Sequence, residues 1–153
     1  MSEDKASFQE FFEVQNELRS LFARHVENIV RTGGVTTHQA MTLKMLKTRD
    51  QMCKMSDIAA MQFLTPAAAT GIVDRLIHLG LVERNFDEND RRVILLALTP
   101  AGEKKLSVVE KRLKDTMQRF LERVSESDRA ASLRMFRKLK EYLKEELNAL
   151  KKK

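Results

Sequence analysis

Apolar residues recur at every third or fourth position near the start of the chain, and this spacing predicts an amphipathic helix over residues 8–30. The apolar positions are Phe8, Phe11, Phe12, Leu18, Leu21, Phe22, Val26, Ile29 and Val30. Gly33 and Gly34 follow, and glycine commonly ends a helix because it adopts the left-handed conformation without strain. Thr36 or Thr37 is then suited to cap a second helix.

A short third helix is predicted after a polar connector that covers residues 49–54. Ser56 follows the connector, and serine is a favoured N-cap because its hydroxyl accepts from an unpaired backbone N–H. The pattern therefore predicts a helix over residues 57–62, with Ser56 as its cap.

Thr65 and Pro66 mark the next helix start, because proline at the first helical position lacks only an N–H that would be unpaired there. This helix is predicted to run to Leu79, with Gly80 as its left-handed stop. Its predicted apolar face consists of Ala69, Ile72, Val73, Leu76 and Leu79.

The pattern becomes strand-like after residue 80. Residues 81–86 and 92–98 are separated by a polar turn, which predicts a β-hairpin. A second Thr-Pro pair, at 99–100, predicts another helix start. The two long helices that follow carry apolar stripes, formed by Leu106, Val109, Leu113, Met117, Phe120 and Val124 and then by Leu133, Phe136, Leu139, Leu143, Leu147 and Leu150.

The net charge of +6 is distributed unevenly along the chain. Residues 1–102 carry 12 Lys and Arg against 13 Asp and Glu, whereas residues 103–153 carry 16 against 9. The segment with the short helices and the hairpin is therefore not basic. Any interaction of that segment with DNA must rest on the arrangement of its residues.

The remaining composition indicates a cytoplasmic protein of one domain. The chain has 153 residues, of which 42% are hydrophobic, enough for a sizeable core. A single cysteine, Cys53, excludes an intramolecular disulfide. The polar N-terminus is unlike a signal peptide, and no apolar run approaches the ~20 residues of a membrane span.

The order of short helix, tight turn, capped helix and hairpin is that of a winged helix-turn-helix. The second helix of the motif would then lie in the major groove. Its outer face is small and nearly uncharged over two turns, and consists of Pro66, Ala67, Thr70, Gly71 and Asp74. Small residues permit close approach to DNA, and Thr70 can bind a base edge. An ordinary buried helix with small packing residues is the alternative interpretation.

The predicted hairpin tip carries Asp90, Arg91 and Arg92. An arginine there can enter a narrow minor groove, and a neighbouring carboxylate can orient it. The alternative is a solvated turn with a local ion pair. Arg75 and Arg84 are suited to backbone phosphates.

Taken together, these segments resemble the MarR family of winged-helix regulators. The resemblance rests on residues 56–59, 65–76, 80–84 and 90–102. The sequence Asp-Arg-Arg followed by Leu-Thr-x-x-Gly, in the last of these segments, is the most diagnostic. The resemblance implies a single domain over residues 1–153, mainly α with a small β-hairpin wing.

The resemblance also implies a homodimer. Residues 36–99 would form the winged helix-turn-helix, and residues 6–32 and 100–150 the flanking dimerisation helices. The expected DNA-binding residues are Ser56, Thr65, Pro66, Ala67, Thr70, Arg75, Arg84, Asp90, Arg91 and Arg92. The expected dimerisation residues are Phe8, Phe11, Phe12, Phe136, Leu139, Leu143 and Leu147. The apolar stripes point to association in their own right, although they could instead cover a monomeric core.

The implied function is sequence-specific binding to a pseudo-palindromic operator, in most such proteins as a repressor released by a small molecule. The effector would be small, aromatic or anionic, and would lie between the first, second and fifth helices. Arg24, His25 and His38 are the candidate contacts, although an ordinary polar or interface role is the commoner one for such residues.

No cofactor or metal is expected, because the three histidines are far apart in sequence and show no metal-ligand spacing. Cys53 is expected to be a buried, unreactive thiol. The sequence contains no phosphate loop and no nucleophile elbow, so an enzyme is not expected. The competing interpretation is a winged-helix module for protein interaction that does not bind DNA.

Overall fold

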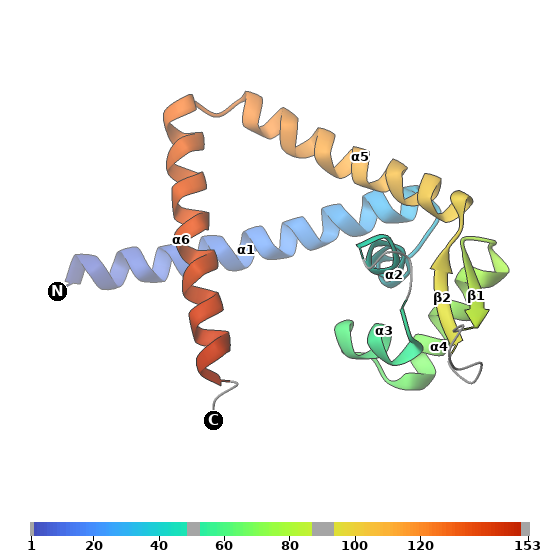
Figure 1. Ribbon diagram of the computed structural model, residues 1–153. Helices are drawn as coiled ribbons and strands as arrows, with labels where there is room; N and C mark the ends of the chain where they lie inside the picture. Colours follow the sequence, from blue (N-terminus) through green and yellow to red (C-terminus); the bar gives the residue numbers. More distant parts are fainter. Residues whose placement is uncertain (1, 49–52, 87–93, 151–153) are drawn as a thin grey trace. The chain divides into compact units, whose positions relative to one another are not determined.

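Helices dominate the part of the chain that the structure describes. A computed structural model describes residues 2–48, 53–86 and 94–150, with side chains described from residue 8 onward (Figure 1). In chain order the elements are α1 (Ser2–Thr32), α2 (Thr37–Thr48), α3 (Met55–Met61), α4 (Pro66–His78), β1 (Val82–Phe86), β2 (Ile94–Leu98), α5 (Pro100–Glu122) and α6 (Glu126–Leu150). The predicted fold class, mainly α with one antiparallel hairpin, is confirmed.

The chain divides into two compact units, Met1–Leu113 and Lys114–Lys153. The first unit contains every element up to β2 together with the first part of α5. The second contains the end of α5 and all of α6. Within the second unit, the Ser125 hydroxyl accepts from the backbone N–H of Asp128 at 3.1 Å and so caps α6.

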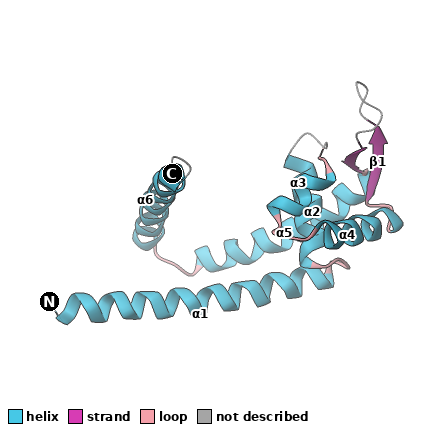
Figure 2. Ribbon diagram, turned by 90° about the horizontal axis from the view of Figure 1, so that it is seen from below, coloured by secondary structure: helices cyan, strands magenta, loops and turns pink. Residues whose placement is uncertain are grey.

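The core of the first unit lies between α2, α3, α4 and the hairpin. Figure 2 shows these three helices gathered beside β1. The largest completely buried side chains are Leu43, Leu46, Ile58, Leu76 and Leu96. Full burial of a side chain of this size stabilises a protein by roughly 1.5–3 kcal/mol relative to leaving it exposed. This cluster therefore holds the short helices against the hairpin.

The predicted hairpin is present, and its two strands pair with Val82 opposite Leu98 and Phe86 opposite Ile94. A third segment bonds to the other edge of β2. The N–H of Cys53 donates to the carbonyl oxygen of Leu96 at 3.3 Å, and the N–H of Leu96 donates to that of Cys53 at 2.9 Å. Cys53 is buried, as expected. The middle of β2 is therefore hydrogen-bonded on both sides.

The structure identifies the N-cap residues of α2 and α3. The first was left open between two threonines, and the second differs from the prediction. Thr36 caps α2, because its hydroxyl accepts from the N–H of Gln39 while its own N–H donates to the Gln39 side chain. For α3 the N-cap residue is Lys54, whose N–H donates to the Asp57 carboxylate at 3.1 Å. Ser56 lies inside the first turn of α3, so the prediction that it caps this helix was wrong.

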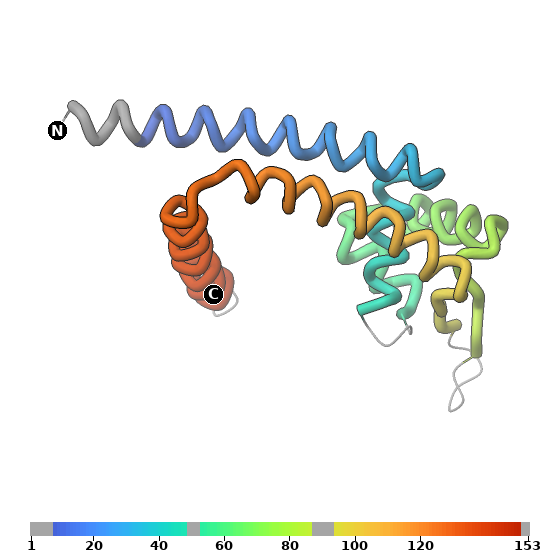
Figure 3. Tube along the Cα trace, turned by 90° about the horizontal axis from the view of Figure 1, so that it is seen from above, coloured from blue at the N-terminus to red at the C-terminus, as the bar shows by residue number. Residues whose placement is uncertain are grey.

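Helix α1 is continuous over its length (Figure 3). Among its described side chains, burial begins only near its C-terminal end, where Val26 and Ile29 are partly buried and Val30 is fully buried. The apolar residues from Phe8 to Phe22 are exposed. Most of the apolar face that the sequence predicted is therefore uncovered within one chain.

The turn between α3 and α4 contains a residue in the left-handed conformation. Phe63 has φ +53°, and its side chain is 97% exposed. The turn is closed by backbone bonds, since the N–H of Leu64 donates to the carbonyl oxygen of Ala59 at 2.9 Å. The left-handed region costs an ordinary side chain about 1–2 kcal/mol, and an exposed ring recovers little of that cost by packing.

We therefore predict that Phe63→Asn raises the free energy of unfolding by about 0.5–1 kcal/mol, because asparagine tolerates the left-handed conformation. Urea denaturation of the variant and the parent measures the difference. A clear loss of stability would mean that the ring packs against the protein, contrary to its exposure.

The end of α4 is joined to the start of α5 by a tight junction. Gly80, with φ +68°, ends α4, and the N–H of Leu81 donates back to the carbonyl oxygen of Leu76 at 2.9 Å. The Thr99 hydroxyl donates to the carbonyl oxygen of Gly80 at 2.7 Å and accepts from the N–H of Gly102 at 3.0 Å. One side chain thus links the end of α4 to the first turn of α5.

The same junction requires a glycine at position 102. A Cβ atom there would lie 2.0 Å from the carbonyl oxygen of Leu81 and 2.8 Å from Cδ1 of Leu98. The first of these contacts is with backbone, which cannot rotate away. The first turn of α5 therefore packs directly on the chain at the base of the hairpin.

Gly102→Ala is expected to lower the free energy of unfolding by about 1–3 kcal/mol, as overpacking does in a buried site. Gly71→Ala is the matched control, because Gly71 also lies within a helix and a Cβ atom added there would meet no other atom within 4 Å. That control should gain about 0.5–1 kcal/mol from the better helix propensity of alanine. Equal effects of the two substitutions in thermal unfolding would contradict the close packing at Gly102.

Candidate nucleic-acid interface

The two faces of α4 divide largely as the sequence predicted. Ala69, Val73 and Leu76 are completely buried and hold the helix on the core. The opposite face is exposed and consists of Pro66, Ala67, Thr70, Gly71 and Asp74. Leu79 was wrongly assigned to the buried face: it is the C-cap residue and is 44% exposed, because it follows the last turn that packs on the core.

The N-terminal end of α4 is built by Thr65 and Pro66. Thr65 is the N-cap, with extended backbone angles, and its hydroxyl accepts from the N–H of Ala68 at 3.3 Å. The hydroxyl of Thr70 donates to the carbonyl oxygen of Pro66 at 2.9 Å. Because a hydroxyl oxygen keeps two lone pairs, Thr70 can still accept a hydrogen bond from outside the helix.

A polar network braces this motif against α2. The amide oxygen of the buried Gln62 lies 2.9 Å from Nδ1 of His38, and its amide nitrogen donates to the Thr42 hydroxyl at 2.8 Å. The Thr42 hydroxyl in turn donates to the backbone carbonyl of His38 at 2.9 Å. An amide oxygen only accepts, so Nδ1 of His38 carries the proton. The network fixes the end of α3, and hence the turn into α4.

An ion pair joins α4 to the hairpin. Nη2 of Arg84, on β1, lies 2.5 Å from Oδ1 of Asp74 on α4, and both side chains are about half exposed. The sequence suggested a phosphate contact for Arg84, and in the free protein its guanidinium is instead paired with a carboxylate. Arg75, the other predicted phosphate contact, is exposed on α4, and Ser56 is exposed on α3.

The predicted wing-tip residues Asp90, Arg91 and Arg92 lie outside the described residues. The two strands that lead to them are described, and they pair as far as Phe86 and Ile94, both of which are exposed. The base of the hairpin is buried, with Val82 and Leu98 in the core.

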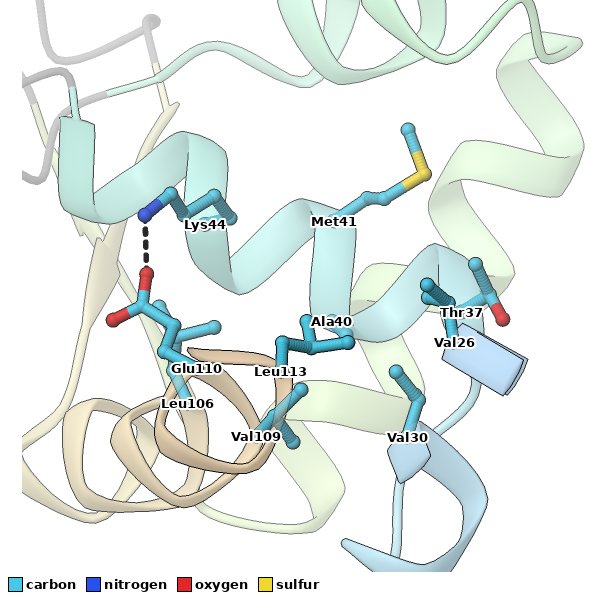
Figure 4. A pocket seen from close by; sticks show the side chains of 10 residues that line it. All are labelled: Val26, Val30, Thr37, Ala40, Met41, Lys44, Leu106, Val109, Glu110 and Leu113. Atoms are coloured by element: carbon cyan, nitrogen blue, oxygen red, sulfur yellow. Dashed lines mark hydrogen bonds and ion pairs between the residues drawn. The ribbon is translucent and has the colours of Figure 1, made fainter. Parts of the chain in front are cut away.

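A cavity of about 420 Å³ lies between α1, α2 and α5 (Figure 4). Its walls are mostly apolar and consist of Val26, Val30, Thr37, Ala40, Met41, Lys44, Leu106, Val109, Glu110 and Leu113. These are the three helices that the sequence indicated for an effector. Arg24, His25 and His38, the residues suggested to contact an effector, are absent from the walls.

The charged groups at the edge of the cavity are Lys44 and Glu110, which form an ion pair across α2 and α5 (Figure 4). Nζ of Lys47 lies 2.9 Å from the other carboxylate oxygen of Glu110. The hydrogen bond from Lys44 holds the pKa of Glu110 below its ordinary value, with Lys47 acting in the same direction and partial burial opposing both. Glu110 also raises the pKa of Lys47.

The predicted dimerisation residues all carry exposed apolar side chains in the single chain: Phe8, Phe11, Phe12, Phe136, Leu139, Leu143 and Leu147. Phe8 and Phe12 stack on each other, with ring centroids 6.3 Å apart. Every described side chain of α6 is exposed.

Neither a metal site nor a membrane-spanning helix is found in the described part of the chain. In residues 2–48, 53–86 and 94–150, no group of three His, Cys, Asp or Glu residues is placed to hold a metal ion. Among the helices that the structure describes, none combines the length and the apolar character needed to cross a membrane.

Two sets of ion pairs were not predicted from the sequence. Asp74 and Arg84 were interpreted separately, although they form one pair; a contact between a helix and a strand ten residues away depends on the tertiary fold. Nor did the sequence predict the links from Glu110 to Lys44 and Lys47, which are more than 60 residues away in sequence. Opposite charges on two helices expected to face each other were the available signal.

Known proteins share both sequence and structure with this chain. A family model described as "MarR family" matches residues 33–93. The HTH-type transcriptional repressor MdtR of Bacillus subtilis is 32% identical over 127 residues, which cover 81% of each chain. The crystal structure of the Bacillus subtilis YusO protein is 31% identical, covers 87% of this chain and 96% of that one, and superposes with a TM-score of 0.72.

More distant structures share the fold. A MarR family protein from Bacillus stearothermophilus is 21% identical, with a TM-score of 0.82, and covers 92% of this chain and 97% of that one. A mutant of Staphylococcus aureus MepR, solved bound to an oligodeoxyribonucleotide, is 19% identical, with a TM-score of 0.66 and the same two coverages.

Proposed function

The chain belongs to the MarR family of winged helix-turn-helix transcriptional regulators, and we propose that it represses transcription by binding a double-stranded DNA operator as a homodimer. The observation that carries the proposal is the exposed, small-residue face at the start of α4, beside a two-stranded hairpin. Repression is supported by the name of the relative MdtR, a transcriptional repressor.

In the proposed complex, α4 lies in the major groove with its first two turns against the bases. Pro66, Ala67 and Thr70 have side chains small enough for close approach, and all three are exposed. The hydroxyl of Thr70 would accept from a base amino group, and the methyl group of Ala67 would contact a thymine methyl. Thr65 and Ser56, at the ends of the two helices of the motif, would contact backbone phosphates.

The hairpin would act as the wing, with Arg92 in the minor groove, Arg91 beside it and Asp90 orienting the guanidinium. A narrow minor groove attracts arginine because its negative potential is enhanced. The resemblance of residues 90–102 to the family pattern supports this assignment. Arg75 would contact a phosphate at the flank of α4.

We assign dimerisation to residues 6–32 and 100–150, and the winged helix-turn-helix to residues 36–99. Large apolar side chains along both α1 and α6 are exposed in one chain, and exposed apolar stripes are typical of an interface. A two-fold dimer would present one copy of α4 to each half of a pseudo-palindrome.

We place a small aromatic or anionic effector in the cavity between α1, α2 and α5. The apolar walls suit an aromatic ring, and Lys44 at its edge suits an anionic group. Lys47, outside the walls, shares the Glu110 carboxylate with Lys44. An anion that binds these lysines would compete with Glu110, and so would loosen the link between α2 and α5. Release from DNA would follow if that link holds the two α4 helices at the operator spacing.

A DNA-binding repressor without catalytic activity acts in the compartment that holds the chromosome, so we assign the protein to the cytoplasm.

The competing candidate is a winged-helix module that binds another protein. Salt separates the two: the affinity of a DNA binder falls steeply with added salt, whereas an interaction module binds no duplex at any salt concentration.

Arg92→Ala is predicted to weaken operator binding by about 1–3 kcal/mol, the value of a good arginine–base contact. The dimer should remain intact, because the substitution lies in the proposed wing. Fluorescence anisotropy with a labelled operator duplex measures the affinity, and gel filtration checks the dimer. Affinity equal to that of the parent would contradict the wing assignment.

Sedimentation equilibrium at micromolar concentration should give twice the chain mass of 17.7 kDa. Phe12→Glu combined with Leu143→Glu should shift the protein toward the monomer, because each change puts a charge into the proposed interface. A parent protein that sediments as a monomer under these conditions would contradict the dimer.

A further inference from the structure

The pair Asp74–Arg84 places a carboxylate on the helix face that is proposed to meet DNA. Asp74 lies four residues after Thr70, one turn further along the same exposed face of α4. DNA carries a negative charge on every phosphate, so a carboxylate on this face opposes binding. The neighbouring Arg84 is the cation that offsets it, with 2.5 Å between Nη2 and Oδ1.

A purely structural role explains this pair poorly. Both side chains are about half exposed, and exposed ion pairs contribute little to stability. Helix α4 is already held by three completely buried side chains, Ala69, Val73 and Leu76. Strand β1 is held separately by its pairing with β2 over five residue pairs. Neither element needs the ion pair to stay in place.

We propose that Asp74 is a specificity-determining residue that withholds Arg84 from DNA phosphates and so limits sequence-independent binding. A phosphate contact by Arg84 would strengthen binding to every duplex alike, because phosphates carry no sequence information. Non-specific sites compete with the operator across the chromosome, so a lower non-specific affinity favours operator occupancy. The proposal rests on the proposed DNA-binding function.

The arrangement of α4 makes the effect unequal between operator and random DNA. On the operator, the depth of α4 is set by base contacts in its first two turns, whereas Asp74 lies in the third turn. On random DNA no base contact fixes the helix, so a released Arg84 can reach the nearest phosphate. Removal of the Asp74 charge should therefore strengthen binding to random DNA more than binding to the operator.

The test is Asp74→Asn, measured by fluorescence anisotropy with a random-sequence duplex and an operator duplex between 50 and 200 mM salt. One added phosphate contact steepens the slope of log K against log salt by about 0.9, which corresponds to about threefold in affinity over that range. We expect that steeper slope and a severalfold higher affinity on random DNA. The ratio of operator to random affinity should fall.

Two further variants test whether the released Arg84 causes the steeper slope. Asp74→Asn combined with Arg84→Gln should restore the parental slope, because the released cation is gone. Glu17→Gln, on the polar face of α1 opposite the apolar residues assigned to the dimer interface, makes the same change in net charge and should leave the slope unchanged. Gel filtration checks that this variant is still a dimer. Thermal unfolding checks that every variant is folded.

Unchanged or weaker binding of Asp74→Asn to random DNA would overturn the proposal, and weaker binding would mean that Asp74 orients Arg84 toward a phosphate. An identical gain for Glu17→Gln would also overturn it, because the effect would then come from net charge alone. A parent protein that binds no duplex at any salt concentration would instead contradict the proposed function itself.

Discussion

The first unit depends on the contact between the first turn of α5 and the chain that leaves α4. Gly102 lies so close to the carbonyl oxygen of Leu81 that no side chain fits between them. The Thr99 hydroxyl adds a bridge from Gly80 to Gly102 within the same few residues. Because α4, the base of the hairpin and α5 meet here, the orientation of α4 is tied to a helix that also forms a wall of the cavity.

The electrostatics around α4 follow from the arrangement of charges and not from net charge. Residues 1–102 carry slightly more acidic than basic residues, and the exposed start of α4 is nearly uncharged. In the proposed complex, close approach of small residues would replace a strong positive field there. Asp74 and Arg84 are a second example, because their charges offset each other at the surface that would face DNA.

Local signals in the sequence predicted most of the elements. Thr65 and Thr99 each cap a helix by accepting from the N–H of the third residue on, and Gly80 ends a helix through its own backbone angle, so these roles could be predicted from the local sequence. Ser56 failed as a cap because Lys54, two residues earlier, has the Asp57 carboxylate within reach of its N–H. The identity of an N-cap residue is ambiguous in the sequence where two residues within one turn could both cap the helix.

The features that the sequence did not predict are contacts between distant segments. His38 was considered for an anion site, but its ring binds Gln62, 24 residues away. The pairing of Glu110 with Lys44 and Lys47 likewise depends on how α2 and α5 pack. Periodicity assigns a residue to a face of a helix, whereas the identity of its partner depends on tertiary packing, which a single sequence does not encode locally.

Selection of binding sites from a pool of random duplexes shows whether two copies of α4 read two half-sites. A two-fold symmetric sequence should be enriched, with half-site centres about 10 base pairs or a multiple of that apart. Enrichment of no sequence, or of a single half-site without symmetry, would contradict the proposed binding of two half-sites.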